Sequence, residues 1–199
     1  MKKNFKLIIL SILFSSVLIS CVNDGDTEIP RVDPAPLYKE SFETNFPNWV
    51  KYSKTGSQVW SLETKYGNPA ECAKITGFSG GANNDNVDWL ISPAQNLSAL
   101  NNAKLSFDNA YKFNGPPIEV YISNNYSGTG NPEVSGVTWT KITGAILSVG
   151  EYKWTGSGSL NISNFTGVGN ETVYIAFKYT STSSEGSTWE IDNVKIATE

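Results

Sequence analysis

Short segments of alternating apolar and polar residues constrain the fold of this chain most strongly. Alternation with a period of two is typical of a half-buried β-strand, and each of ten such segments is about four to ten residues long. No window of eleven or more residues beyond residue 37 has helical periodicity, although residues 96–102 could form one helical turn. The segments cover residues 37–43, 57–62, 72–76, 87–91, 104–113, 118–122, 138–142, 159–162, 172–179 and 189–196. The pattern predicts an all-β domain.

Turn residues separate these segments at regular spacing. Gly67-Asn68-Pro69 and Gly115-Pro116-Pro117 are two examples, and such residues favour tight turns. About ten strands spaced in this way predict two antiparallel sheets packed as a β-sandwich or jelly roll. The aromatic residues expected in its core are Phe42, Trp60, Trp89, Phe107, Tyr121, Tyr174, Phe177 and Trp189.

The first twenty residues are typical of a bacterial signal peptide. Lys2, Lys3 and Lys6 precede an apolar run over residues 7–19, which is too short for a stop-transfer helix. The run ends in Leu18-Ile19-Ser20-Cys21, which resembles the lipobox of bacterial lipoproteins. This placement of Cys21 predicts a lipid-modified N-terminus, and the alternative is an ordinary cleaved signal with a chance cysteine.

An acidic, proline-containing stretch follows the lipobox. Residues 21–36 contain four acids and three prolines, a composition that favours an extended spacer over a packed core. Acidic residues directly after the lipidated cysteine resemble the surface-export signals of some Gram-negative lipoproteins. We therefore expect residues 37–199 to form one domain, held at the surface of the bacterial outer membrane by a lipid anchor alone.

Charge and composition exclude several classes of function. The formal net charge is −4, and it becomes about −7 if the three N-terminal lysines are removed with the signal peptide, which opposes binding to nucleic acid. Histidine is absent, so sites and catalytic pairs that need it are excluded. With Cys21 lipidated, Cys72 has no disulfide partner, and its alternating segment predicts a buried core residue rather than a reactive thiol.

Seven segments together resemble a known family, the choice-of-anchor J domain. This family is related to the cleaved-adhesin domains of bacterial surface proteins and, more distantly, to MAM domains. The resemblance covers about residues 37–197 and implies a galactose-binding-like jelly roll at the cell surface, frequently with a structural Ca²⁺ ion. The segments are Glu40–Glu43, Phe46–Trp49, Val87–Pro93, Leu105–Asp108, Ile118–Ser123, Val173–Tyr179 and Trp189–Val194, and the most specific are DWLISP and WEIDNV.

Five carboxylates are candidate ligands for that Ca²⁺ ion: Glu40, Glu43, Asp88, Asp108 and Asp192. The first and last strands of a jelly roll are commonly neighbours, so antiparallel pairing can place Glu40 opposite Asp192. Two carboxylates on an apolar face repel each other and are costly to bury unless a cation lies between them. The alternative is that the facing is displaced by one residue and the acids point to solvent.

Four aromatic residues lie on or near the later loops and could bind a sugar: Tyr126, Trp139, Tyr152 and Trp154. An exposed ring can stack on a sugar face while neighbouring asparagines satisfy its hydroxyls. The alternative is that these rings cover the edge of the sandwich.

The sequence predicts a non-catalytic surface module that binds a neutral glycan or a surface protein. A structural subunit of a surface complex is the second hypothesis. The third hypothesis is a glycoside hydrolase or an accessory domain of one. Paired carboxylates can cleave glycosidic bonds. Five further acids are scattered along the chain and predict no such pair: Glu119, Glu133, Glu151, Glu171 and Glu185.

Overall fold

The computed structural model describes residues 35–46 and 48–198. The signal peptide, Cys21 and nearly all of the spacer lie outside the described residues, so the statements about them stay predictions. Within the described part of the chain, no helix has the length and apolar character needed to cross a bilayer.

The described residues form fourteen strands and one short 3-10 turn, η1 (Ser163–Phe165). The strands are β1 (Tyr38–Glu40), β2 (Val50–Thr55), β3 (Ser61–Glu63), β4 (Cys72–Thr76), β5 (Phe78–Ser79), β6 (Ala82–Asn83), β7 (Asn86–Ile91), β8 (Lys104–Lys112), β9 (Glu119–Ser123), β10 (Thr140–Ile142), β11 (Thr155–Gly156), β12 (Leu160–Asn161), β13 (Tyr174–Ser181) and β14 (Thr188–Ala197).

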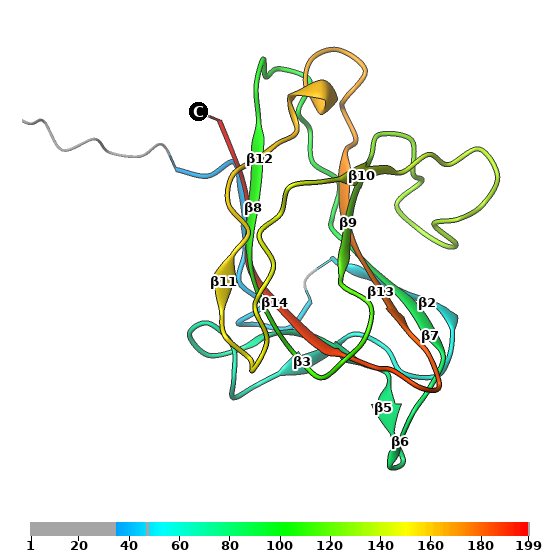
Figure 1. The fold of residues 1–199 in the computed structure, drawn as a ribbon. Coiled ribbons are helices and arrows are strands. Elements are labelled where there is room, and N and C mark those ends of the chain that lie inside the picture. The colour runs from blue at the N-terminus through cyan, green and yellow to red at the C-terminus, as the bar shows by residue number, and fades with distance from the viewer. Residues whose placement is uncertain (1–34, 47, 199) are drawn as a thin grey trace, which may run out of the picture. The chain divides into compact units, whose positions relative to one another are not determined.

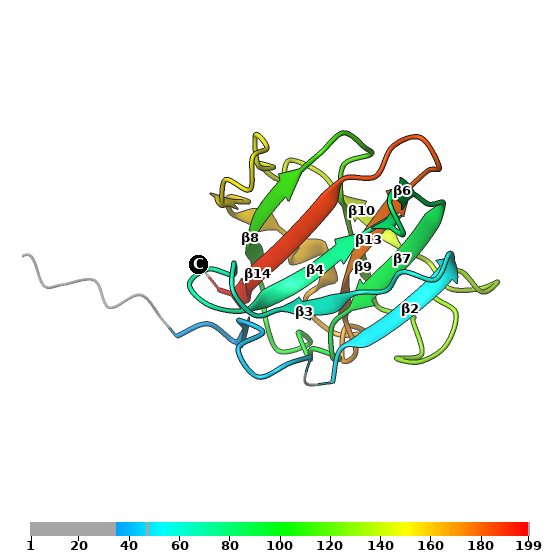
Figure 2. The same ribbon diagram turned by 90° about the horizontal axis from the view of Figure 1, so that it is seen from below.

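Two large antiparallel sheets face each other across the core, as Figure 1 shows with β8 and β14 on one side and β9 and β13 on the other. The seven-stranded sheet has the order β11-β8-β14-β4-β3, with β1 added to β14 and β12 added to β8. The five-stranded sheet has the order β10-β9-β13-β7-β2, and β5 and β6 form a separate hairpin. Figure 2 shows the long central strand β14 between β8 and β4. The predicted all-β jelly-roll sandwich is confirmed.

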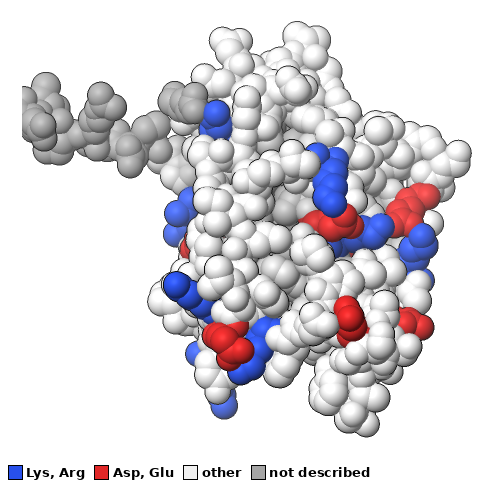
Figure 3. Space-filling view, in the orientation of Figure 1, with Lys and Arg blue, Asp and Glu red and all other residues white. Residues whose placement is uncertain are grey.

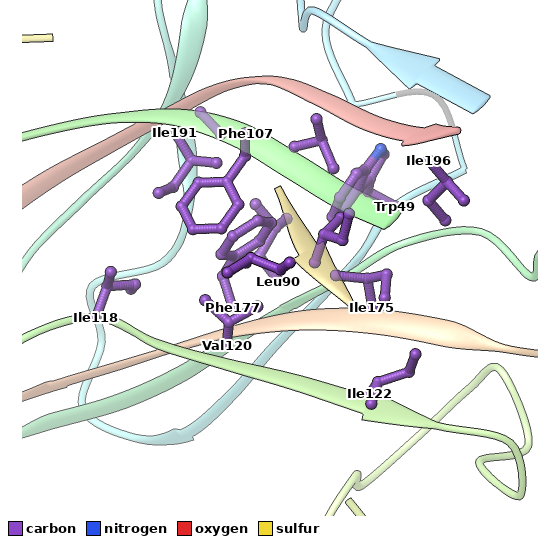
Figure 4. Close-up of a cluster of buried hydrophobic side chains, with 14 of the residues drawn as sticks. Trp49, Leu90, Phe107, Ile118, Val120, Ile122, Ile175, Phe177, Ile191 and Ile196 are labelled. Atoms are coloured by element: carbon purple, nitrogen blue, oxygen red, sulfur yellow. The ribbon is translucent and has the colours of Figure 1, made fainter. Parts of the chain in front are cut away.

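Side chains from both sheets interdigitate in the core, as strand alternation requires. Phe107 of β8 meets Phe177 of β13 edge to face, with ring centroids 5.0 Å apart. Figure 4 shows Ile191 beside Phe107, and Val120 beside Phe177. Of the eight aromatic residues expected in the core, seven are buried and Tyr121 is half-buried.

The ten predicted segments each overlap a strand. Four further strands, β2, β5, β6 and β11, were not predicted because they are short or polar. The segment over β2, Val-Lys-Tyr-Ser-Lys-Thr, has only two strongly apolar residues, and β5, β6 and β11 have two residues each. Residues 96–102 form turns and bends rather than a helix, while the one helical turn of the described chain is η1.

The first and last strands pair antiparallel, as predicted, but in a different register. Glu40 lies opposite Val194 rather than Asp192. A bulge displaces the pairing of β14 with β8 between Asp192 and Lys195, and β1 pairs with β14 over residues 194–196, which begin within this bulge. The expected face-to-face pair of Glu40 and Asp192 is therefore wrong by two residues.

Candidate functional site

The outer face of the seven-stranded sheet is polar because its strands alternate strictly. On β14, Trp189 and Ile191 enter the core, so Glu190 between them points outward. On β4, the core residues Ala73 and Ile75 flank Lys74 in the same way, and Lys74 lies directly opposite Glu190. A carboxylate and an ammonium group are thus placed side by side on this face.

A cleft of about 520 Å³ opens above these two residues. Its other lining residues are Tyr66, from the loop between β3 and β4, and Tyr152 and Trp154, from the loop before β11. The Trp154 indole N–H donates a hydrogen bond to the Tyr66 carbonyl oxygen at 3.2 Å, which joins the two loops. The cleft therefore has two strand residues and three aromatic side chains in its lining.

Backbone contacts hold the loop that carries Tyr152. Glu151 and Tyr152 both have left-handed backbones, with φ of 53° and 54°. Such conformations cost about 1 kcal/mol or more for non-glycine residues, so they need support from their surroundings. The Tyr152 N–H donates to the Tyr111 carbonyl oxygen at 2.9 Å, and the Ser148 hydroxyl donates to the Lys153 carbonyl oxygen at 2.6 Å. These bonds fix the loop from which Tyr152 projects.

Glu190 is the chemically unusual residue of the cleft. Its side chain is 1% exposed, and its buried Oε2 atom has no hydrogen-bond partner. Burial raises the pKa of Glu190 to about 7, the charge of Lys74 opposes that rise, and the charge of Glu63 adds to it. An unsatisfied buried acceptor costs about 1–3 kcal/mol, so a ligand that supplies a donor would recover part of that free energy.

Two cations near the cleft are paired with acids. Lys74 Nζ lies 2.6 Å from Glu63 Oε2, and Lys112 Nζ lies 2.8 Å from Glu151 Oε2. Figure 3 shows mixed groups of blue and red atoms as well as isolated charged residues, with wide uncharged areas between them. The ion pairs of Lys74 and Lys112 favour neither a polyanion nor a polycation.

The aromatic residues expected to bind a ligand divide into two pairs. Tyr152 and Trp154 line the cleft. Tyr126 and Trp139 lie instead over the outer face of the five-stranded sheet, where both rings pack in the cluster around Trp89. Tyr126 is 3% exposed, and the Trp139 indole N–H donates to the Pro132 carbonyl oxygen at 2.9 Å. The expectation that Tyr126 is an exposed platform is wrong, because the strand face beneath it is apolar and is covered by its loop.

Two of the candidate metal ligands meet on the outer face of the seven-stranded sheet. Asp108 of β8 lies opposite Asp192 of β14. Asp192 accepts hydrogen bonds from the backbone N–H groups of Asn68 and Asn193, at 2.8 and 2.6 Å. Asp108 Oδ2 accepts from the side-chain amides of the same two asparagines, at 3.1 and 3.0 Å. Burial raises the pKa of Asp192 to about 6, the two backbone bonds lower it, and the charges of Glu43 and Asp108 raise it further.

The remaining candidate ligands have different surroundings. Glu43 is exposed and close enough for its charge to act on Asp192. Glu40 accepts hydrogen bonds from the Phe42 backbone and the Trp49 indole, at 2.7 and 3.2 Å. Asp88 lies on β7 in the other sheet. Among the described residues, no three His, Cys, Asp or Glu side chains form a group that could hold a metal by themselves.

Carboxylate and amide oxygens are nevertheless the ligands that Ca²⁺ prefers, and two buried or half-buried carboxylates face each other here. The chemistry of the donor set around Asp108 and Asp192 therefore fits this ion, with the amide oxygens of Asn68 and Asn193 as further donors if their side chains turn.

Three residues of the cleft were not predicted: Tyr66, Lys74 and Glu190. Glu190 lies within the segment WEIDNV, between two residues of strong core character, so its outward direction could have been derived from alternation alone. The same reasoning applies to Lys74. Nothing local marks Tyr66, because its place depends on the path of its loop. Cys72 is buried as expected, and burial raises the pKa of its thiol.

Residues 75–199 match the profile of a family described as Domain of unknown function (DUF5017). The chain belongs to this family. The match includes Glu190, Tyr152 and Trp154, and it begins just after Lys74. No curated protein sequence matches the chain significantly.

The DUF5017 chain also resembles domains of known structure. One is the K1 cleaved adhesin domain of Lys-gingipain from Porphyromonas gingivalis W83, with 21% identity, a TM-score of 0.57, and coverage of 81% of this chain and 98% of that domain. The K3 cleaved adhesin domain of the same protein gives 19% identity, a TM-score of 0.53, and coverage of 81% and 97%. These likenesses establish a shared fold, and the narrower resemblance to choice-of-anchor J domains stays a prediction.

A third likeness shows why fold alone does not define the function of this DUF5017 domain. It is to the enzymatically active domain of tailspike protein 4 of bacteriophage CBA120, with 14% identity and a TM-score of 0.51, over 79% of this chain and 20% of that one. The same sandwich thus occurs both in adhesin domains and within an enzymatically active protein. The function has to be argued from the site itself.

Proposed function

We propose that this DUF5017 domain is a non-catalytic module that binds a neutral glycan in the cleft lined by Tyr66, Tyr152 and Trp154. The observation that carries the proposal is the combination of three aromatic side chains with a buried, unpartnered carboxyl oxygen of Glu190. Apolar walls with a few polar groups are typical of small-ligand sites.

The chemistry of a sugar matches both parts of this lining. The C–H groups of a pyranose ring pack on an aromatic face, and its hydroxyl groups both donate and accept hydrogen bonds. A hydroxyl could donate to Glu190 Oε2, and Lys74 Nζ could donate to another sugar oxygen while it keeps its contact with Glu63. An uncharged sugar would leave the ion pairs of Lys74 and Lys112 undisturbed.

The arrangement of acids favours binding over hydrolysis. Glycosidases generally place two carboxyl groups on either side of the scissile bond. Among the described residues that line the cleft, Glu190 is the acidic one. Glu63 lies nearby, but its oxygens accept hydrogen bonds from the Lys74 ammonium and the Lys65 backbone at 2.6 and 3.2 Å. The word adhesin in the names of the K1 and K3 domains agrees with a binding role, although the likeness itself concerns the fold.

The test is retention on a panel of neutral polysaccharides, with release of reducing ends measured in the same samples. We expect the purified full-length protein to be retained on at least one glucan, xylan, mannan or galactan without producing new reducing ends. Hydrolysis would contradict the non-catalytic assignment. Failure to bind any glycan, with capture of a surface protein instead, would support the assembly-subunit alternative.

We also propose that the module is displayed from a lipid anchor on Cys21 at the surface of the bacterial outer membrane. The support is the position of Cys21 directly after the apolar run and the acidic spacer behind it. Cys21→Ala is expected to move the protein from the membrane fraction to the soluble fraction in detergent-free fractionation. A variant that still sediments with membranes would contradict the anchor.

We further propose a structural Ca²⁺ site at Asp108 and Asp192, with the two neighbouring asparagines, Asn68 and Asn193, as additional oxygen donors and with the exposed Glu43 acting on the site through its charge. The support is the facing pair of carboxylates and the effect of the Glu43 charge on Asp192. When bound, the ion would supply the positive charge that offsets the repulsion between these acids. Glu40 and Asp88 are not part of this proposal because their surroundings differ.

A further inference from the structure

Two further hollows lie near the cleft. The first, of about 340 Å³, has Phe113, Asn114, Val149 and Glu151 in its lining. The second, of about 250 Å³, lies beside the β5–β6 hairpin, and its lining includes Phe78, Asn83, Phe113 and Asn114. We call them the middle hollow and the hairpin hollow.

The three hollows are connected through shared or touching walls. Phe113 and Asn114 line both the middle hollow and the hairpin hollow. The Phe113 ring also contacts the Tyr152 ring edge to face, with centroids 6.4 Å apart, and Tyr152 lines the cleft. The middle hollow therefore adjoins the hairpin hollow, and the contact between Phe113 and Tyr152 links both to the cleft.

Aromatic rings repeat along this surface. Phe78 and Phe113 are 53% and 57% exposed, although large apolar side chains are usually buried. Phe113 has a left-handed backbone with φ of 72°, a conformation that is unfavourable for an aromatic residue. Asn83 and Asn114 line the hairpin hollow together with these two rings and add polar groups to it.

The charges along the surface are balanced, as they are at the cleft. Lys112 Nζ lies 5.7 Å from the Phe113 ring centroid and 6.0 Å from that of Tyr152. The same ammonium group is paired with Glu151 at 2.8 Å. An extended anion would have to compete with this carboxylate, whereas an uncharged chain would not.

From this geometry we infer that the binding site is a groove for a linear neutral polysaccharide, with the cleft as one subsite and the middle and hairpin hollows as further subsites. The inference rests on the proposed function and deepens it, because it names an internal stretch of a chain, rather than a single terminal sugar, as the ligand. Each ring along the groove would stack on a different sugar unit. Affinity should then rise with chain length until the groove is filled.

The experiment uses oligosaccharides of one to six units, prepared from whichever neutral polysaccharide retains the protein, with dissociation constants measured by calorimetry. We expect affinity to increase by at least about tenfold between two and six units. Phe113→Ala and Phe78→Ala should weaken binding of the six-unit chain about three- to tenfold. Phe78→Ala should leave binding of the two-unit chain unchanged, because Phe78 does not line the cleft. Trp154→Ala should weaken binding of both. Val168→Ala, at a 96% exposed residue that lines none of the three hollows, is the matched control.

The possible failures are distinguishable. Binding that depends on Trp154 but is equal for two and six units would overturn the groove and leave the cleft in place. An unchanged six-unit affinity in both Phe78→Ala and Phe113→Ala would have the same consequence. Absence of binding to every glycan would overturn the groove together with the proposed function.

Discussion

The two outer faces of this sandwich carry loops rich in aromatic residues, but the loops do opposite things. On the five-stranded sheet, the loop over residues 124–139 packs Tyr126 and Trp139 onto Trp89 and buries it. On the seven-stranded sheet, the loops that carry Tyr66 and Trp154 meet by one hydrogen bond and leave a cleft beneath them.

The difference originates in the strands below the loops. The outward residues Trp89, Ile91 and Ala176 are apolar, so water is unfavourable at that face and a cover is stabilising. The outward residues Glu190 and Lys74 are polar, so their face does not require a cover. An aromatic residue in a loop therefore packs as a lid over an apolar strand face, and lines a site over a polar one.

The largest expected effect concerns the covered face. Trp89→Ala should lower the free energy of unfolding by about 3–5 kcal/mol, because it removes a buried ring that contacts Tyr121 and Trp139 at 5.4 and 5.3 Å. Trp154→Ala, on the open face, should cost less than about 1 kcal/mol. Urea unfolding of both variants measures the difference. Equal losses of stability would contradict the distinction between lid and lining.

The second effect concerns the acidic pair on the open face. If Ca²⁺ binds at Asp108 and Asp192, an ion concentration one hundred times the dissociation constant stabilises the fold by about 2.7 kcal/mol. Chelation should then lower the melting temperature, and Asp192→Ala should abolish that response. Asp88→Asn, on the other sheet, should keep it. A melting temperature that does not change when chelator is added would contradict the proposed Ca²⁺ site.

The third effect concerns Asp88, which points inward beneath the covered sheet. Burial raises its pKa to about 6, while hydrogen bonds from Ser53 and Asn86 lower it, and its Oδ1 atom has no partner. A carboxyl with a raised folded-state pKa binds its proton more tightly in the folded protein, so stability increases as pH falls from about 7 towards 4.

Asp88→Asn should therefore be more stable than the wild type by about 1–2 kcal/mol at pH 7 and nearly equal to it at pH 4. Glu190 and Asp192 shift in the same direction, so the readout is the difference between variant and wild type at each pH. A stability difference that does not change with pH would show that folding does not raise the pKa of Asp88.

Most of the fold could be predicted from the sequence because it depends on local alternation. The period-two pattern identified the three longest strands of the sandwich, β8, β13 and β14. It missed β2, whose polar residues weaken the pattern, and the two-residue strands, which are too short to show one. The register of β1 on β14 depended on a bulge that no local pattern marks.

The site was less predictable because it depends on contacts between distant parts of the chain. Lys54 and Lys178 both pair with Glu133, which holds the 124–139 loop against its sheet. Tyr126 and Trp139 are therefore part of a lid. The sequence does not distinguish them from Tyr152 and Trp154, because all four residues lie in or near polar loops. The outward direction of Glu190 could have been derived from strand alternation. The two loops that form the cleft above it could not, because their paths depend on contacts between distant residues.

We propose that the open face binds a glycan and that the covered face does not. Affinity electrophoresis in gels containing neutral polysaccharides tests it most directly, with the wild type, Trp154→Ala and the conservative variant Trp139→Phe run side by side. We expect at least one polysaccharide to retard the wild type and Trp139→Phe equally. The retardation of Trp154→Ala, measured against its migration in a gel without polysaccharide, should be several-fold smaller. Equal retardation of all three proteins, or loss of retardation in Trp139→Phe alone, would contradict it.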